Sequence, residues 1–212
     1  MSTSRRGKLG ARSGRAPAGS EPYHHGDLRA ALLKAAGKLL EADGPEALSL
    51  RDIARRLGVS HNAPYRHFAT REALLGAIAT EGFRELGTAM ASAAQSAGGG
   101  TDRLDRMGMA YIAFALERPQ RFRLMFGGAK GQSPELDASA KAAFMALGGA
   151  AGTRFGSTPN LAAVRAWAFV HGIAHLLLDK QIKAVLMGGR TPLQFAALLL
   201  DQAGTTVEPG AG

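Results

Sequence analysis

The 212-residue chain contains no cysteine, which excludes a disulfide framework, a thiolate metal site and a thiol-based sensor. Long apolar runs are also missing, because stretches such as 110–116 and 195–200 are far shorter than the roughly 20 residues that cross a bilayer. The first basic residues are followed by Gly, Ser, Ala and Pro rather than by the apolar segment of a secretory signal. We therefore expect a cytoplasmic protein that is not inserted in a membrane.

The chain also lacks a recognisable catalytic set. No Ser-His-Asp, paired-carboxylate or metal-ligand pattern occurs in helical registers that would bring its members together. The lysine in GGAKGQS, residues 127–133, does not have the spacing of a phosphate-binding loop, and no strand is predicted before it. We expect no enzymatic activity, no cofactor and no bound metal.

Positive charge is abundant and unevenly distributed. The formal net charge is +9, and residues 1–80 hold 13 Lys and Arg against 7 Asp and Glu, whereas the rest of the chain holds 13 against 10. An excess of basic residues in one region is typical of a protein that binds a polyanion there. A generally basic composition is the alternative explanation.

The most informative stretch is SLRDIARRLGVSHNAPYRHF, residues 49–68. Ser49 and Asp52 have the spacing of a capping box, which predicts that a helix begins here. Apolar residues then recur every three or four positions through Leu57, and Gly58 can end the helix in the left-handed conformation. Ser60 can cap a second short helix that runs to residue 68.

Two short helices joined by a tight turn form a helix-turn-helix, in which the second helix enters the major groove of DNA. The second predicted helix offers polar groups suited to bases and phosphates, beginning with Ser60, His61 and Asn62 and continuing with Tyr65, Arg66 and His67. Pro64 is compatible with the first turn of this helix. The alternative is an ordinary helical corner of an all-helical protein.

Flanking segments complete a predicted DNA-binding domain over residues 23–70. Residues 1–22 are basic and rich in Gly, Ser, Ala and Pro, so we expect a disordered arm that either reaches along DNA or is simply solvated. Asp27 can cap a first helix whose apolar stripe begins at Leu28 and ends near Leu40. The adjacent His24 and His25 lack further ligands nearby and do not predict a metal site.

The rest of the chain predicts an all-α body over residues 71–203. Thr70 can cap a connecting helix over 71–97, and the body begins near residue 101. Further helices are expected over 102–117, 120–126, 134–155, 161–187 and 193–202, the last one capped by Thr191 and Pro192. Residues 204–212 are expected to be a disordered tail.

The last two predicted helices carry apolar residues around most of their circumference. Such helices must be covered on two sides, and a symmetric four-helix contact with a second copy would provide the second cover. We therefore expect a homodimer through these helices. A monomer with both helices at the centre of its core is the alternative.

This layout resembles the TetR family of bacterial transcriptional repressors over nearly the whole chain. The resemblance is strongest over residues 28–75, around SLRDIARRLGVSHNAPYRHFATREALL. Two shorter motifs resemble a subclass with a Trp-His-Gly mark in its ligand-sensing domain. They are YHHGDLR at 23–29 and the set Trp167, His171 and Gly172.

The resemblance implies a function for particular residues. In the predicted helix-turn-helix, bases would be faced by Ser60, His61, Asn62 and Ala63, and phosphates would be held by Tyr65, His67, Thr70 and Arg71. In the body, a pocket for an unidentified small molecule would be formed by Tyr111, Phe114, Phe122, Arg123, Phe126, Trp167, His171 and His175, with Met107 nearby. The three residues Trp167, His171 and His175 are spaced four apart and therefore share a helix face.

The expected protein is a ligand-responsive repressor that binds double-stranded DNA at a near-palindromic operator. Family members commonly have Gly-Thr-Leu before the tyrosine, where this chain has Asn62, Ala63 and Pro64, so the operator sequence cannot be transferred. An architectural DNA-binding protein without a ligand is the alternative. His171 and Asp179 lie about 12 Å apart along an unbroken helix and could not share an ion, whereas a two-histidine site completed by other ligands is left open.

Overall fold

The computed structural model describes residues 28–96, 98, 100–127, 133–155 and 159–203. Throughout these residues the secondary structure is helical, as expected. The α-helices are α1 (Leu28–Asp43), α2 (Leu50–Arg56), α3 (Arg71–Gln95), α4 (Gly100–Glu117), α5 (Pro119–Phe126), α6 (Pro134–Phe155), α7 (Pro159–Leu178), α8 (Ala184–Met187) and α9 (Pro192–Gln202), with 3-10 turns η1 (Pro45–Ala47) and η2 (Pro64–Arg66). The predicted arm, the Asp27 cap, the tail and most of GGAKGQS lie outside the described residues.

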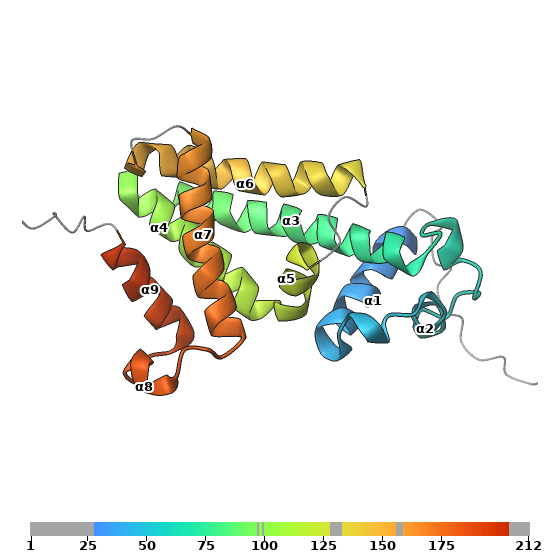
Figure 1. Cartoon of the computed structure of the whole chain (residues 1–212). Helices are drawn as coiled ribbons and strands as arrows, with labels where there is room; N and C mark the ends of the chain where they lie inside the picture. Colours follow the sequence, from blue (N-terminus) through green and yellow to red (C-terminus); the bar gives the residue numbers. More distant parts are fainter. Residues whose placement is uncertain (1–27, 97, 99, 128–132, 156–158, 204–212) are drawn as a thin grey trace, which may run out of the picture.

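A small head is formed by α1, η1, α2, η2 and the first turns of α3 (Figure 1). Its core contains Leu32, Ile53 and Leu74, all with no exposed surface, and continues along α3 to Ile78. The apolar stripe predicted for the first helix is therefore confirmed as the side that packs on α2 and α3. Because α3 supplies part of this core and then runs on into the body, one continuous helix connects the head to the body.

The body packs around the remainder of α3, which is the longest described helix. Helices α4 and α6 lie along α3, α7 crosses α4 and α6, and α9 packs on α4 (Figure 1). The second core runs from Phe83 on α3 to Leu200 on α9. The predicted body helices agree with α4, α5, α6 and α9 to within two residues at each end.

The predicted helix starts are formed by the expected side chains. Thr70 accepts a hydrogen bond from the amide of Ala73 at 3.1 Å, and Thr191 forms a complete capping box with Gln194. Ser49 accepts a hydrogen bond from the Asp52 amide at 3.4 Å. The Asp52 carboxylate, however, pairs with Arg55 at 2.8 Å, so the N-terminal cap of α2 is a serine cap with an adjacent ion pair.

The prediction of a second α-helix over residues 60–68 is wrong in this structure. Residues 61–63 form a turn, and only the single 3-10 turn η2 follows. Pro64 has no amide hydrogen to donate to the carbonyl of Ser60, and its ring disfavours that carbonyl's position in an α-helix. The chain instead closes hydrogen bonds from Ala63 to Ser60 at 3.0 Å and from His67 to Pro64 at 2.9 Å.

The prediction of one helix over residues 161–187 is also wrong, because α7 ends at Leu178. Lys180 takes the left-handed conformation, with φ of 53°. The amide of Lys180 then donates to Leu177 at 3.2 Å and the amide of Gln181 donates to Leu176 at 2.9 Å. These two bonds satisfy carbonyls in the last turn of α7, so the helix ends there and α8 forms as a separate helix.

In the described residues, one stretch, 160–178 of α7, is long and apolar enough by composition to cross a membrane, with a mean hydropathy of 1.5. A single helix of this kind is weak evidence for a membrane span, because core helices pass the same test. One side of α7 packs into the body through Ala162, Ala166, Val170 and Ala174. That packing accounts for the apolar composition of this side.

Head and body are joined by a carboxylate on α1. Glu41 accepts hydrogen bonds from the amides of Gln120 at 3.1 Å and Arg121 at 2.9 Å, in the first turn of α5. The Arg121 guanidinium in turn pairs with Glu85 on α3 at 2.7 Å. A negative charge at a helix N-terminus is favourable, both because it satisfies free amides and because it opposes the helix dipole.

We expect Glu41→Ala to lower the free energy of unfolding by about 1 to 2 kcal/mol, the usual cost of losing a helix cap and its dipole interaction. Urea unfolding followed by circular dichroism would measure this loss. Glu41→Gln keeps one acceptor oxygen without the charge and should fall between the wild type and the alanine variant. Equal stability of all three proteins would show that the contact does not hold α5 to α1.

Candidate nucleic-acid interface and ligand cavity

The residues predicted to touch DNA lie on the segment between α2 and α3, except for Arg71, which is the first residue of α3. Buried Pro64 and Phe68 anchor this segment in the head. The side chains that remain exposed are Ser60, His61, Asn62, Tyr65, Arg66 and Thr70, whereas Ala63 and His67 are half-buried. The structure therefore exposes hydrogen-bonding side chains at Ser60, His61, Asn62, Tyr65 and Arg66, here called the polar row, although they do not lie on an α-helix.

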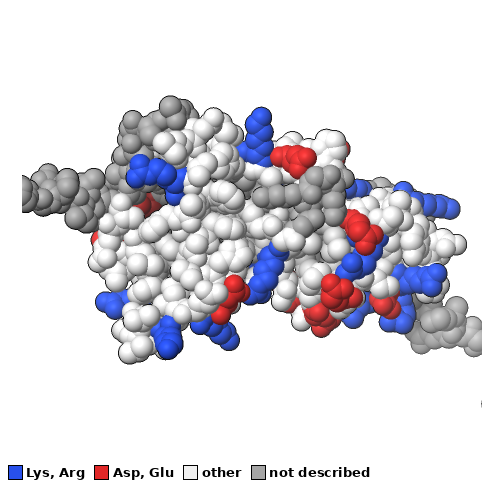
Figure 2. All heavy atoms as spheres, viewed as in Figure 1, with Lys and Arg blue, Asp and Glu red and all other residues white. Residues whose placement is uncertain are grey.

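Basic side chains accompany this surface. Figure 2 shows Lys and Arg at the end of the molecule formed by the head, interspersed with acidic residues. On α2, Arg55 and Arg56 are exposed, and Arg66 follows on η2. Arginine side chains of this kind can neutralise phosphates.

Two predicted phosphate ligands have contacts within the head. Arg71 donates from Nε to the carbonyl of Leu48 at 3.1 Å and from Nη2 to the carbonyl of Pro45, and its side chain is 33% exposed. Thr70 uses its hydroxyl as the cap of α3. Arg71 therefore holds the loop before α2, which sequence reasoning did not anticipate, whereas the cap formed by Thr70 was predicted.

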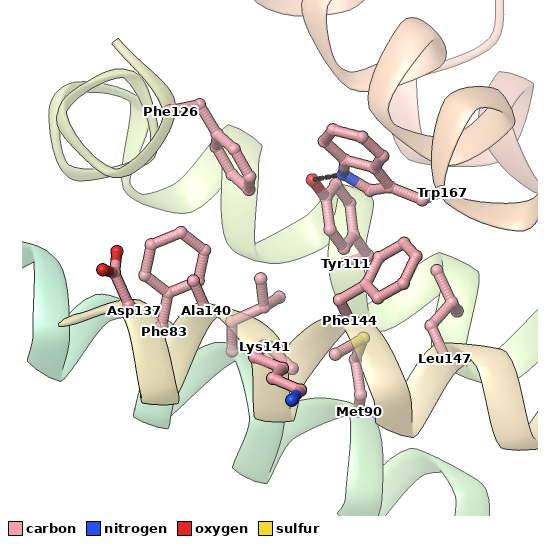
Figure 3. A pocket seen from close by; sticks show the side chains of 12 residues that line it. Phe83, Met90, Tyr111, Phe126, Asp137, Ala140, Lys141, Phe144, Leu147 and Trp167 are labelled. Carbon is pink, nitrogen blue, oxygen red and sulfur yellow. Dashed lines mark hydrogen bonds between the residues drawn. The ribbon is translucent and has the colours of Figure 1, made fainter. Parts of the chain in front are cut away.

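The body contains a cavity of about 360 Å³ between α3, α4, α5, α6 and α7 (Figure 3). Of the predicted ligand residues, Tyr111, Phe126 and Trp167 line it. The other lining side chains come from α3 and α6, which the sequence analysis did not include in the pocket: Phe83, Leu86, Met90, Asp137, Ala140, Lys141, Ala143, Phe144 and Leu147.

The remaining predicted ligand residues lie outside this lining. Phe114 is buried, with Arg118 over its ring at 5.3 Å. Phe122 is fully buried and packs between Tyr111 and the two histidines of α7. Met107 is likewise core. Phe122 therefore packs against the lining residue Tyr111, whereas Phe114 and Met107 belong to the surrounding core.

A hydrogen-bonded chain runs along one wall. Trp167 Nε1 donates to the hydroxyl of Tyr111 at 3.3 Å (Figure 3). That hydroxyl lies 2.8 Å from Nδ1 of His171. An indole nitrogen is only a donor, so the tyrosine oxygen accepts here and its own hydrogen is available to His171. Burial raises the pKa of the Tyr111 phenol well above its ordinary value, which keeps the group neutral.

The histidine pair continues this chain toward α5. The rings of His171 and His175 lie 4.5 Å apart, and His175 is 3.9 Å from the Asp179 carboxylate. Arg123 bonds the same carboxylate at 2.8 Å and is the main reason that the pKa of Asp179 lies below its ordinary value. In the part of the chain that the structure describes, no group of three or more His, Asp or Glu is placed to hold a metal ion.

A face of exposed apolar side chains lies outside the cavity. On α7, Leu161, Val164, Phe169 and Leu176 are 40% to 54% exposed, and their spacing places them on one side of the helix. Further exposed apolar side chains follow on α8 and α9, namely Val185, Leu186 and Leu193. Figure 2 shows the surface over α7 as largely uncharged.

The head and the body each match a known family description. Residues 32–78 match the description "Bacterial regulatory proteins, tetR family", and residues 104–202 match "Tetracyclin repressor-like, C-terminal domain". These ranges contain the polar row and most of the cavity, respectively. Neither description names the Trp-His-Gly subclass, which stays a prediction.

Individual proteins show the same similarity. The HTH-type transcriptional repressor Rv3405c of Mycobacterium tuberculosis is 44% identical over 57 residues, which are 27% of this chain and 30% of that protein. A Rhodococcus sp. RHA1 protein of unknown function is 34% identical over 87% of this chain and 97% of its own, with a TM-score of 0.74. The TetR family regulator PfmR of Thermus thermophilus has the same fold, with 24% identity over 84% and 98% of the two chains and a TM-score of 0.61.

Proposed function

The chain belongs to the tetR family of bacterial regulatory proteins, and we propose that it is a cytoplasmic, ligand-responsive transcriptional repressor that binds a near-palindromic operator as a homodimer. The observation that carries this proposal is the exposed polar row from Ser60 to Arg66 on a head that is rigidly joined to a body with an apolar cavity. A purely architectural DNA-binding protein would need the first feature and not the second.

Two copies would present two polar rows to the same side of the duplex. In helix-turn-helix dimers the half-sites lie about 34 to 36 Å apart, one turn of DNA, so the two heads enter successive major grooves. The apolar face of α7, continued by α8 and α9, supports a dimer contact that would set this separation. Covering that face also removes the exposed apolar surface of the isolated protomer.

The cavity has two direct mechanical links to the head. Helix α5 contributes Phe126 to the lining, while its first turn is held by Glu41 of the head. Helix α3 contributes Phe83 to the lining and Ile78 to the core of the head. A ligand that moved either helix would therefore tilt the head and change the separation of the two polar rows.

Such a ligand would act by binding more tightly to the form that does not fit the operator, since differential affinity alone can shift the equilibrium. Saturating inducer should then weaken operator binding. An operator affinity that stays the same with bound inducer would contradict this mechanism.

The function is tested by selecting genomic fragments with the purified protein at physiological salt and footprinting the retained fragments. We expect a shared near-palindrome protected over two half-sites one turn apart. The ratio of specific to nonspecific affinity should fall in the range of roughly 10³ to 10⁷ that sequence-specific regulators reach. Fragments retained without a shared motif would instead identify an architectural protein, and no retention would contradict DNA binding.

A further inference from the structure

The interior of the cavity is apolar and contains few polar atoms. Phe83, Phe126, Phe144 and Trp167 provide aromatic surfaces, with the rings of Phe144 and Trp167 edge to face at 6.1 Å. Met90 and the leucines of α3 and α6 complete the walls. Close packing of a ligand against these rings would yield most of its binding free energy from buried apolar surface.

The polar atoms inside the cavity can form hydrogen bonds with little more than one neutral group of a ligand. The hydroxyl of Tyr111 already accepts from Trp167 and lies within hydrogen-bond distance of His171. One lone pair of this oxygen remains for a donor on the ligand. Tyr111 is 2% exposed, so an ion placed beside its hydroxyl would lose its hydration without gaining an opposite charge.

Charge is confined to the rim of the cavity. Of the described lining residues, only Asp137 and Lys141 are acidic or basic, and both are exposed on α6. Figure 3 shows the amine of Lys141 directed away from the hydroxyl of Tyr111, and Asp137 at the opposite end of the lining from that hydroxyl. Because the two charges are opposite and four residues apart, their fields offset each other and favour neither an anion nor a cation.

We propose that the cavity selects an uncharged, compact, ring-containing molecule with at most one neutral hydrogen-bonding group, enclosed between the aromatic side chains of α3, α5, α6 and α7. This inference rests on the proposed function for its role as inducer, but the binding preference itself is a property of the cavity. The volume of about 360 Å³ lies near the lower end of typical ligand pockets, which is consistent with a small ring system.

Three probes with the same cage and different charges test this preference. They are 1-adamantanol, adamantane-1-carboxylate and 1-adamantylammonium at pH 7.5, none of which absorbs where tryptophan is excited. Trp167 is the only tryptophan of the chain and lines the cavity, so its fluorescence reports binding at this site. We expect the alcohol to bind at least about tenfold more tightly than either ion, because only the ions must be desolvated without a partner.

A pair of variants on α6 locates the binding site. Ala140→Phe should fill the cavity and weaken binding of 1-adamantanol at least about tenfold, because Ala140 lines it. Ala142→Phe makes the same change at an exposed position outside the lining and should leave the affinity unchanged. Equal effects of the two variants would overturn the assignment of the site.

The outcomes separate this inference from the proposed function. An ion that binds as tightly as the alcohol, or no binding of the alcohol up to its solubility, would overturn the neutral-ligand proposal even if operator binding is intact. Binding of the alcohol with the expected preference, without any release of DNA when the cavity is saturated, would uphold the preference and contradict the inducer role.

Discussion

Leu176→Glu should prevent formation of the proposed dimer and weaken operator binding by about 100-fold or more. Leu176 is 41% exposed on the apolar face of α7, so the protomer can accommodate a carboxylate there. In the dimer the same carboxylate would be buried against an apolar surface without a partner, at a large desolvation cost. Monomeric heads then bind each half-site separately and lose the avidity of the pair, which typically contributes roughly 10² to 10⁴ in affinity.

Met145→Glu is the matched control for this variant. Met145 is 45% exposed on α6, so the substitution changes the same chemistry at a similar exposure but outside the proposed contact. Light scattering after size exclusion would give the mass of each variant, and titration of the footprinted operator would give its affinity. A dimeric Leu176→Glu protein with normal operator binding would show that the two copies meet through another surface.

The helix periodicity and the caps could be predicted because they are local. Thr70 and Thr191 cap the helices that follow them, and the stripe of α1 from Leu28 to Leu40 forms part of the core of the head. Each signal lies within a few residues of the structure that it specifies. The helices of an all-helical fold of this kind can therefore largely be predicted without knowledge of distant contacts.

The errors arose where no local signal exists or where two signals compete. After the end of α7, Lys180 takes the left-handed conformation, for which the usual sequence signal would be a glycine. The neighbouring Asp179 forms an ion pair with Arg123 of α5, which is a tertiary contact and has no local signal. At residues 60–68 a polar helix start competes with Pro64, and the proline prevails. A prediction based only on the helix-start signal at Ser60 therefore gave an α-helix where a 3-10 turn forms.

The cavity could be predicted only in part, because its walls come from distant segments. Tyr111, Phe126 and Trp167 were found as aromatic residues of the body, and all three line it. Phe83 and Met90 lie on the connecting helix, whose apolar residues look like ordinary core residues in the sequence. Only the packing of α6 along α3 shows that these side chains border a cavity as well as packing on their neighbours.

Asn62→Ala and Arg66→Ala should both weaken operator binding, but in different ways. Asn62 is exposed near the start of the polar row, and an asparagine amide can make two hydrogen bonds to adenine in the major groove. Loss of this side chain should make the free energy of operator binding less favourable by about 1 to 3 kcal/mol and relax the base preference at one base pair of each half-site. Arg66 is exposed on η2 and is proposed to neutralise a phosphate, so its loss should weaken binding to all sequences alike.

The salt dependence of the affinity separates these two roles. Removing one phosphate contact from each head should lower the slope of log affinity against log salt by about 0.9 per contact, whereas Asn62→Ala should leave the slope unchanged. The measurement is a titration of the operator and of single-base variants at several salt concentrations. Lys34→Ala, an exposed change on α1 outside the proposed interface, is the control for general loss of positive charge. If Asn62→Ala and Lys34→Ala behave alike, the polar row does not read bases, and the specificity of the head must arise from the shape of the DNA.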